Sequence, residues 1–153
     1  MEALEGLAPL ERKSVLDVGT GTGILSMTAI LLGARCVVAL DIDNDAVLTC
    51  RRNAALNRMN DRLWTFQGTV DAVNRAARFD LVLANIHGDI ILKEAYRLIN
   101  HTGKKGFLVL SGLDYTDSRP VKTAMEKQGM EEVSIFFLEE YVTQVWHRSQ
   151  GRD

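Results

Sequence analysis

The stretch "SVLDVGTGTGI" (14–24) decides the fold, because a short apolar run is followed directly by Gly19, Gly21 and Gly23. An apolar run of this length that ends at glycine is typical of a buried β-strand. Glycine allows a tight turn and lets a ligand lie against bare backbone. A turn without a ligand needs one glycine rather than three, so the stretch predicts a ligand-binding loop between a strand and a helix.

Strand-like and helix-like segments alternate along the rest of the chain. We expect strands at 14–18, 35–41, 63–67, 79–85 and 105–111, helices at 23–32, 44–59, 89–100 and 118–129 (Pro120 in the first turn of the last), and closing strands at 132–139 and 141–148. Five strand-then-helix steps with strands apolar on both faces predict an α/β fold. The expected sheet is Rossmann-like, doubly wound, seven-stranded and mostly parallel, with a C-terminal antiparallel hairpin. We expect residues 1–153 to form one domain.

Composition limits the functional classes. The chain has 153 residues, of which 46% are apolar and 25% charged, as in an ordinary globular protein. Lysine and arginine total 18 against 20 acidic residues, which gives no strong electrostatic case for nucleic acid or anionic membrane. Cys36 and Cys50 are interpreted as buried free thiols, and the acidic start of the chain is unlike a signal peptide. These features predict a cytoplasmic protein. The three histidines have no metal-ligand spacing, so no metal site is expected.

The glycine spacing argues against a dinucleotide. The dinucleotide pattern G-x-G-x-x-G would require glycine at position 24, where Ile24 stands. Asp17 precedes the loop, and a carboxylate is a poor neighbour for a pyrophosphate because like charges repel. The loop therefore favours a ligand that has no phosphate and carries a positive group. Asp17 would bind a cationic amine of that ligand or hold the amides of the loop.

An acidic residue ends the second predicted strand. Asp41 stands where a carboxylate binds both hydroxyls of a ribose in folds of this class, and Ile42 beside it would cover one face of an adenine. The alternative role for Asp41 is a helix N-terminal carboxylate. Asp43, Asn44 and Asp45 can fill that role, so the ribose interpretation is favoured.

The stretches "VLDVGTGTG" (15–23) and "VVALDID" (37–43) resemble the class I methyltransferases that use S-adenosylmethionine. The stretch "FDLVLANIHGDIILKEAYRLINHTGKKGFLVLSGL" (79–113) is similar to the PrmA-type ribosomal-protein methyltransferases. These enzymes methylate lysine side chains and an N-terminal amine on a large-subunit protein. The resemblance implies S-adenosyl-L-methionine as cofactor and a ribosomal protein as substrate, with no membrane partner. It does not indicate an oligomeric state.

The resemblance also implies particular site residues. It makes Gly19, Asp41 and Asn85 cofactor contacts. By their positions in the loop, Asp17, Thr20, Gly21 and Gly23 are added as expected contacts, and Ile42 is added beside Asp41. Many methyltransferases carry an adenine contact after the third strand; here Thr69 or Asp71 would serve, and the choice stays open, with Thr69 preferred.

Asn85 ends the fourth predicted strand, which we expect to lie beside the glycine loop. Its amide can donate and accept, so it would orient an amine nucleophile or the cofactor's tail. The alternative, a cap for the helix near Asp89, would place Asn85 too far ahead of the helix. Ile86 and His87 are expected on the substrate side. His87 replaces the usual leucine and is either solvated or a substrate contact or proton acceptor.

The match departs from the family at the start of the chain. The family has a separate N-terminal domain that recognises the ribosomal protein and a Gly/Thr/His-rich loop that folds over the cofactor, and nothing in this sequence corresponds to either. We therefore expect the isolated chain to bind the cofactor and to transfer methyl slowly or not at all. The alternatives are a small-molecule or RNA methyltransferase on the same scaffold, and a cofactor-binding domain without catalysis.

Overall fold

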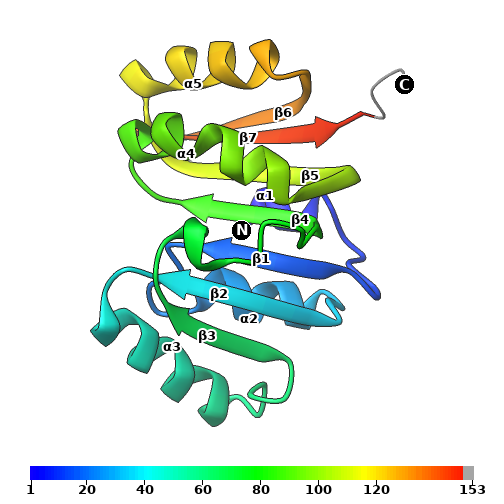
Figure 1. Ribbon diagram of the computed structural model, residues 1–153, viewed down its shortest axis with the longest axis vertical. Helices are drawn as coiled ribbons and strands as arrows, with labels where there is room; N and C mark the ends of the chain where they lie inside the picture. Colours follow the sequence, from blue (N-terminus) through cyan, green and yellow to red (C-terminus); the bar gives the residue numbers. More distant parts are fainter. Residues whose placement is uncertain (150–153) are drawn as a thin grey trace. The chain divides into compact units, whose positions relative to one another are not determined.

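The computed structural model describes residues 1–149 and shows an α/β protein with a seven-stranded mixed sheet (Figure 1). The chain divides into two compact units, of which the first is Met1–Asn74 and the second begins at Arg75. Among residues 1–149, no helix has both the length and the apolar composition that a membrane span requires.

The first unit is built around three parallel strands. Its elements are α1 (Glu2–Glu5), β1 (Ser14–Val18), α2 (Ile24–Leu31), β2 (Cys36–Asp41), α3 (Asn44–Leu56), β3 (Leu63–Gln67) and the 3₁₀ turn η1 (Val70–Ala72). The strand order is β3-β2-β1, with Val18 opposite Leu40 and Asp41 opposite Gln67. Helix α2 packs on β1 and β2, and α3 packs on β2 and β3. The glycine loop and Asp41 therefore leave the carboxyl ends of neighbouring strands.

The second unit carries four strands in the order β4-β5-β7-β6. Its elements are β4 (Phe79–Asn85), α4 (Gly88–His101), β5 (Thr102–Asp114), α5 (Tyr115–Lys127), β6 (Met130–Leu138) and β7 (Tyr141–Arg148). Strands β4 and β5 are parallel, whereas β7 is antiparallel to both β5 and β6. Helices α4 and α5 pack against each other and against β5 (Figure 1).

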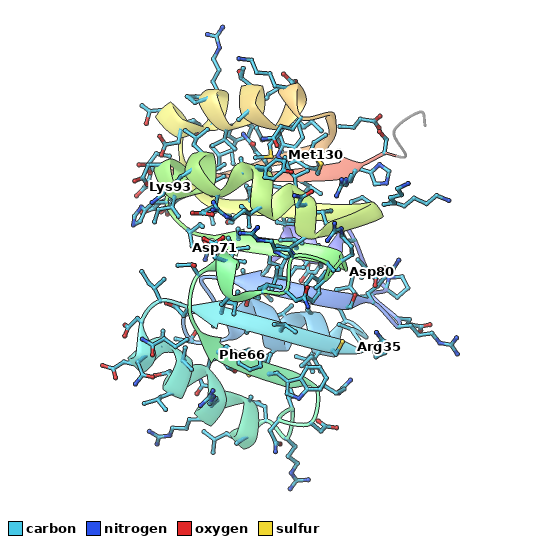
Figure 2. All side chains as sticks on the ribbon, in the orientation of Figure 1. Arg35, Phe66, Asp71, Asp80, Lys93 and Met130 are labelled. Atoms are coloured by element: carbon cyan, nitrogen blue, oxygen red, sulfur yellow. The ribbon has the colours of Figure 1, made fainter. Side chains whose placement is uncertain are left out.

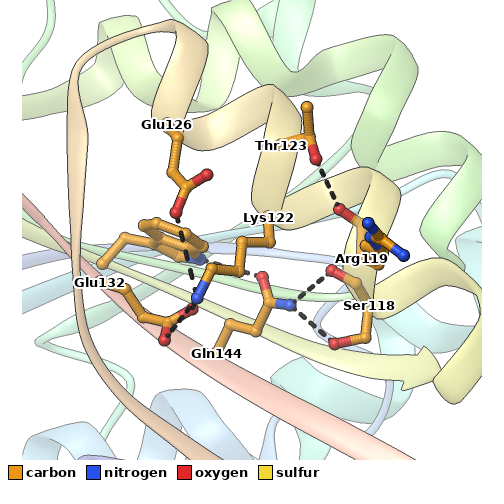
Figure 3. A network of polar contacts seen from close by, with 8 residues as sticks. Ser118, Arg119, Lys122, Thr123, Glu126, Glu132 and Gln144 are labelled. Atoms are coloured by element: carbon orange, nitrogen blue, oxygen red, sulfur yellow. Dashed lines mark hydrogen bonds and ion pairs between the residues drawn. The ribbon is translucent and has the colours of Figure 1, made fainter.

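Polar contacts fasten α5 to the C-terminal hairpin (Figure 3). The buried Gln144 of β7 donates from Nε2 to the carbonyl oxygen of Ser118 at 2.8 Å and accepts from Nε1 of Trp146 at 3.2 Å. Lys122 lies 3.0 Å from the Glu132 carboxylate of β6. Because buried polar groups are costly without partners, the Gln144 contacts fix the position of α5 on β7.

The predicted fold class is confirmed, with corrections at element boundaries. Five strand-then-helix steps were expected, but the segment between β3 and β4 contains only the 3₁₀ turn η1 and no α-helix. Helix α5 begins at Tyr115, so the placement of Pro120 in the first turn was wrong; this residue lies inside the helix. Helix α3 ends at Leu56 rather than at 59, and Arg58 has a left-handed backbone with φ of 57°. Cys50 is buried as expected, but Cys36 is half-exposed.

Candidate functional site

The three loop glycines all adopt a left-handed backbone, with φ of 77° at Gly19, 55° at Gly21 and 84° at Gly23. Residues with a Cβ rarely adopt this left-handed backbone conformation, which explains why glycine is repeated in the loop. A Cβ added at Gly21 would meet nothing within 4 Å, so open space lies above the backbone there. A Cβ added at Gly23 would lie 2.5 Å from Sγ of Cys50 in α3. Gly23 is therefore required for helix packing, and only its backbone is available to a ligand.

Asp17 is fully buried beneath the loop. Its Oδ2 accepts hydrogen bonds from the hydroxyls of Ser26 at 2.6 Å and Thr20 at 2.8 Å. Its Oδ1 is buried and has no hydrogen-bond partner among residues 1–149. Burial raises the pKa of Asp17 above its ordinary value, against the lowering effect of the two hydroxyls.

These contacts limit how two of the expected loop residues, Asp17 and Thr20, could act on a ligand. The Asp17 carboxylate is held by the hydroxyls of Thr20 and Ser26 rather than by amides of the glycine loop. The Thr20 side chain is buried and points inward, where its hydroxyl also lies 3.8 Å from Sγ of Cys50. Thr20 can therefore offer a ligand only its backbone.

Asp41 lies at the end of β2 and holds the loop from the other side. Its Oδ2 accepts from the backbone N–H of Gly21 at 2.9 Å, and its Oδ1 accepts from that of Asp43 at 3.0 Å. Asp43, not Asp41, caps α3, because its Oδ1 accepts from the backbone N–H of Asp45 at 2.9 Å. Asp43 therefore fills the helix N-terminal role that was the alternative interpretation of Asp41. Sequence reasoning missed the bond between Asp41 and Gly21, which no short-range pattern signals.

Exposed groups surround Asp41 in the first unit. Ile42 is 69% exposed, and Gln67 donates from Nε2 to the Ile42 carbonyl oxygen at 3.2 Å. Phe66 projects from the exposed face of β3 (Figure 2). Thr69 is exposed and precedes η1 without a capping bond from its hydroxyl, while Asp71 lies within η1. Gln67 was not predicted from the sequence, although it ends the strand beside Asp41.

In the second unit, Asn85 is the last residue of β4, is exposed, and lies opposite Ser111 of β5. It does not cap α4, whose N-cap is His87. Gly112 has φ of 75°, and a Cβ there would lie 2.9 Å from Oδ1 of Asn85. The absence of a side chain at Gly112 therefore leaves room for the Asn85 amide. Ile86 is half-buried and His87 is exposed.

A family model described as ribosomal protein L11 methyltransferase (PrmA) matches residues 1–149. The chain belongs to this family. Curated PrmA-family relatives named ribosomal protein L11 methyltransferase include one from Pelobacter propionicus, 36% identical over 97% of this chain and 47% of its own length. One from Geotalea daltonii is 43% identical over 72% of this chain and 35% of its own length. The chain thus spans less than half the length of these PrmA-family relatives.

Solved structures agree with the PrmA assignment. The ribosomal protein L11 methylase of Lactobacillus delbrueckii subsp. bulgaricus has a TM-score of 0.89 and 27% identity, covering 97% of this chain and 77% of that one. An RNA methyltransferase from Salinibacter ruber, in complex with S-adenosyl-L-homocysteine, has a TM-score of 0.76 and 18% identity, covering 99% and 92%. At that identity the second likeness shows the fold alone.

Proposed function

We propose that this PrmA-family chain is an S-adenosylmethionine-dependent methyltransferase domain whose substrates are amine groups of ribosomal protein L11. One observation carries the proposal. The backbone N–H of Gly21 donates a 2.9 Å hydrogen bond to the Asp41 carboxylate, and open space lies above the left-handed backbone of Gly21. The bond holds the bare loop next to the carboxylate that we propose binds ribose, in a chain whose family is named for methyl transfer.

The residues of the first unit fit an adenosine that carries a cationic tail. Asp41 would bind the ribose hydroxyls, Ile42 would cover one adenine face, and Thr69 or Asp71 would bind the adenine amine. Gly19 and Gly21 would bring bare backbone against the ligand. The buried Asp17 carboxyl, with its unpartnered Oδ1, would favour a cationic amine over a phosphate above the loop, because a nearby cation stabilises its ionised form.

Asn85 is the proposed catalytic residue. S-adenosylmethionine, when bound, supplies an electrophilic methyl carbon attached to a sulfonium. The Oδ1 of Asn85 would accept a hydrogen bond from the neutral amine of the substrate and so aim its lone pair. The amine would gain a C–N bond while the methyl carbon–sulfur bond breaks, so that S-adenosylhomocysteine is the leaving group and the methylated amine gives up one proton to solvent. Because Asn85 does not titrate, the substrate amine must lose its extra proton before transfer. Ile86 and His87 would contact the substrate beside it.

A protein substrate is favoured over RNA by the relatives and by charge. The curated relatives are named for a ribosomal protein, and the chain carries a formal net charge of −2, whereas RNA-binding surfaces are basic. We further propose that residues 1–153 act as one methyltransferase domain in the cytoplasm.

A transfer assay tests the proposed function. The chain is incubated with methyl-labelled S-adenosylmethionine and either purified ribosomal protein L11 or ribosomal RNA, and the label in each substrate is counted. We expect transfer that falls at least tenfold in Asn85→Ala, while Asn57→Ala, at the end of α3, keeps the wild-type rate. Label transferred to RNA but not to L11 would support the alternative RNA substrate, and cofactor binding without any transfer would support the non-catalytic alternative.

A further inference from the structure

Four large apolar side chains are exposed at one end of the second unit, in two pairs on opposite faces of its sheet. They are Tyr115, Phe137, Leu138 and Tyr141, with exposed fractions of 55%, 58%, 74% and 49%, and we call them the aromatic rim. The rings of Tyr115 and Phe137 are stacked, with centroids 5.9 Å apart and planes inclined by 16°. Monomeric proteins seldom expose large groups of apolar side chains, and such groups usually mark a site that binds another molecule.

The aromatic rim continues the sheet edge at which Asn85 ends. Asp114, Tyr141 and Leu138 lie side by side across β5, β7 and β6, and Tyr115 follows Asp114 directly. Asn85 lies opposite Ser111, whose hydroxyl is 2.9 Å from that of Thr143 in β7. The rim and Asn85 therefore lie at the same edge of the second unit, formed by the carboxyl ends of β4, β5 and β6 and by the amino end of the antiparallel β7.

Acidic groups accompany the aromatic rim without cations to balance them. Asp114, Glu139 and Glu140 are exposed, and within residues 1–149 none of the three takes part in an ion pair. The sequence has no lysine or arginine from 106 to 118 or from 133 to 147. The rim thus combines flat aromatic faces with uncompensated negative charge.

We propose that the aromatic rim docks a lysine-bearing segment of the protein substrate. This proposal rests on the proposed function, and charge complementarity selects the occupant. An ammonium group is attracted to an exposed face of the stacked Tyr115 and Phe137 rings and to the nearby carboxylates, while its aliphatic stem packs on the same rings. A phosphate backbone would be repelled by the same carboxylates. The rim would hold one lysine-bearing stretch while an amine of the same substrate reaches Asn85.

Binding of purified ribosomal protein L11 to the chain tests the proposal by calorimetry, with no turnover required. We expect the charge reversal Glu139→Lys/Glu140→Lys to weaken L11 binding at least tenfold. The matched reversal Asp61→Lys/Glu131→Lys changes the net charge equally at the amino ends of strands and should leave binding within twofold. Wild-type binding should weaken as salt is raised. Phe137→Ala should weaken L11 binding at least fivefold, whereas Tyr96→Ala, an exposed tyrosine on α4, should not.

Three results would overturn the docking proposal. These are L11 affinity unchanged by the Glu139 and Glu140 reversal, tighter binding of a double-stranded RNA than of L11 by the wild type, and a wild-type dimer that Phe137→Ala converts to monomer. Binding of S-adenosylhomocysteine is measured on every variant. Intact cofactor binding with lost L11 binding supports the rim, while absent cofactor binding in the wild type counts against the proposed function instead.

Discussion

Asp17 is a buried carboxyl group with one oxygen satisfied by two hydroxyls and the other without a partner within residues 1–149. The sequence correctly placed this acidic residue before the loop. No sequence pattern indicated that the Thr20 and Ser26 hydroxyls would donate hydrogen bonds to the Asp17 carboxylate. Hydroxyl residues look alike in a sequence whether they face solvent or a buried charge, so this part of the site could not be predicted.

Asp17→Asn should change how stability depends on pH. Burial raises the pKa of Asp17 from 3.8, so the folded state retains a proton that the unfolded chain releases. The unfolding free energy of the wild type should therefore fall, relative to Asp17→Asn, as pH rises from about 4 through the raised pKa. Chemical denaturation at several pH values measures this difference. A difference that stays constant across that range would show that Asp17 is ionised in the fold.

Gly112→Ala should impair transfer by displacing Asn85. The added Cβ would lie 2.9 Å from Oδ1 of Asn85, so the amide must move. Gly129→Ala is the matched control, because its φ of 77° is close to the 75° of Gly112 and no atom lies within 4 Å of its Cβ position. Both variants should lose about 1–2 kcal/mol of stability from left-handed strain. Only Gly112→Ala should lower kcat for transfer, by at least tenfold. Equal kcat values in the two variants would exclude this positioning role.

The elements were predicted well where the hydrophobic pattern is strong. Strands β1, β3, β4 and β7 have the predicted bounds. Of these, β1 and β4 are mostly apolar runs, whereas β3 and β7 mix apolar and polar residues. The ends of α3 and α5 were misjudged. Just after α3, Arg58 adopts the left-handed conformation that usually marks a helix end at glycine, so no glycine in the sequence indicated this end. In α5, Pro120 lies inside the helix, although proline usually indicates a first turn. Likewise, Arg148 of β7 donates to the Ile99 and Thr102 carbonyl oxygens, at 2.7 Å and 2.6 Å, and no local pattern encodes such a distant partner.

Gly23→Ala should destabilise the packing of α2 against α3. Its Cβ would lie 2.5 Å from Sγ of Cys50, which is fully buried, and the left-handed backbone adds strain. We expect a loss of about 2–4 kcal/mol in thermal or denaturant unfolding. Cys50→Ala in the same chain should recover part of this loss by removing the sulfur. If the double variant is no more stable than Gly23→Ala, the loss of stability comes from backbone strain at position 23 alone and not from the contact with the Cys50 sulfur.

For the molecule as a whole, the sequence predicted the class of fold and the family, because motif and alternation agree along the entire chain. The prediction that residues 1–153 form one domain stays untested, and the structure divides the chain into two compact units. The acidic aromatic rim escaped prediction, because Tyr115 and the hairpin are distant in sequence and meet only through the pairing of β5, β7 and β6.

The central claim is that the glycine loop and Asp41 bind the adenosine of S-adenosylmethionine. Titration calorimetry with S-adenosylhomocysteine on the wild type, Asp41→Ala and Asp43→Ala tests it most directly. Asp41→Ala loses a charged hydrogen-bond acceptor worth about 1.5–3 kcal/mol, which corresponds to a Kd raised about tenfold or more. Asp43→Ala loses only the α3 cap and should keep the wild-type Kd. A wild type that does not bind, or equal Kd values for the wild type and Asp41→Ala, would contradict the claim.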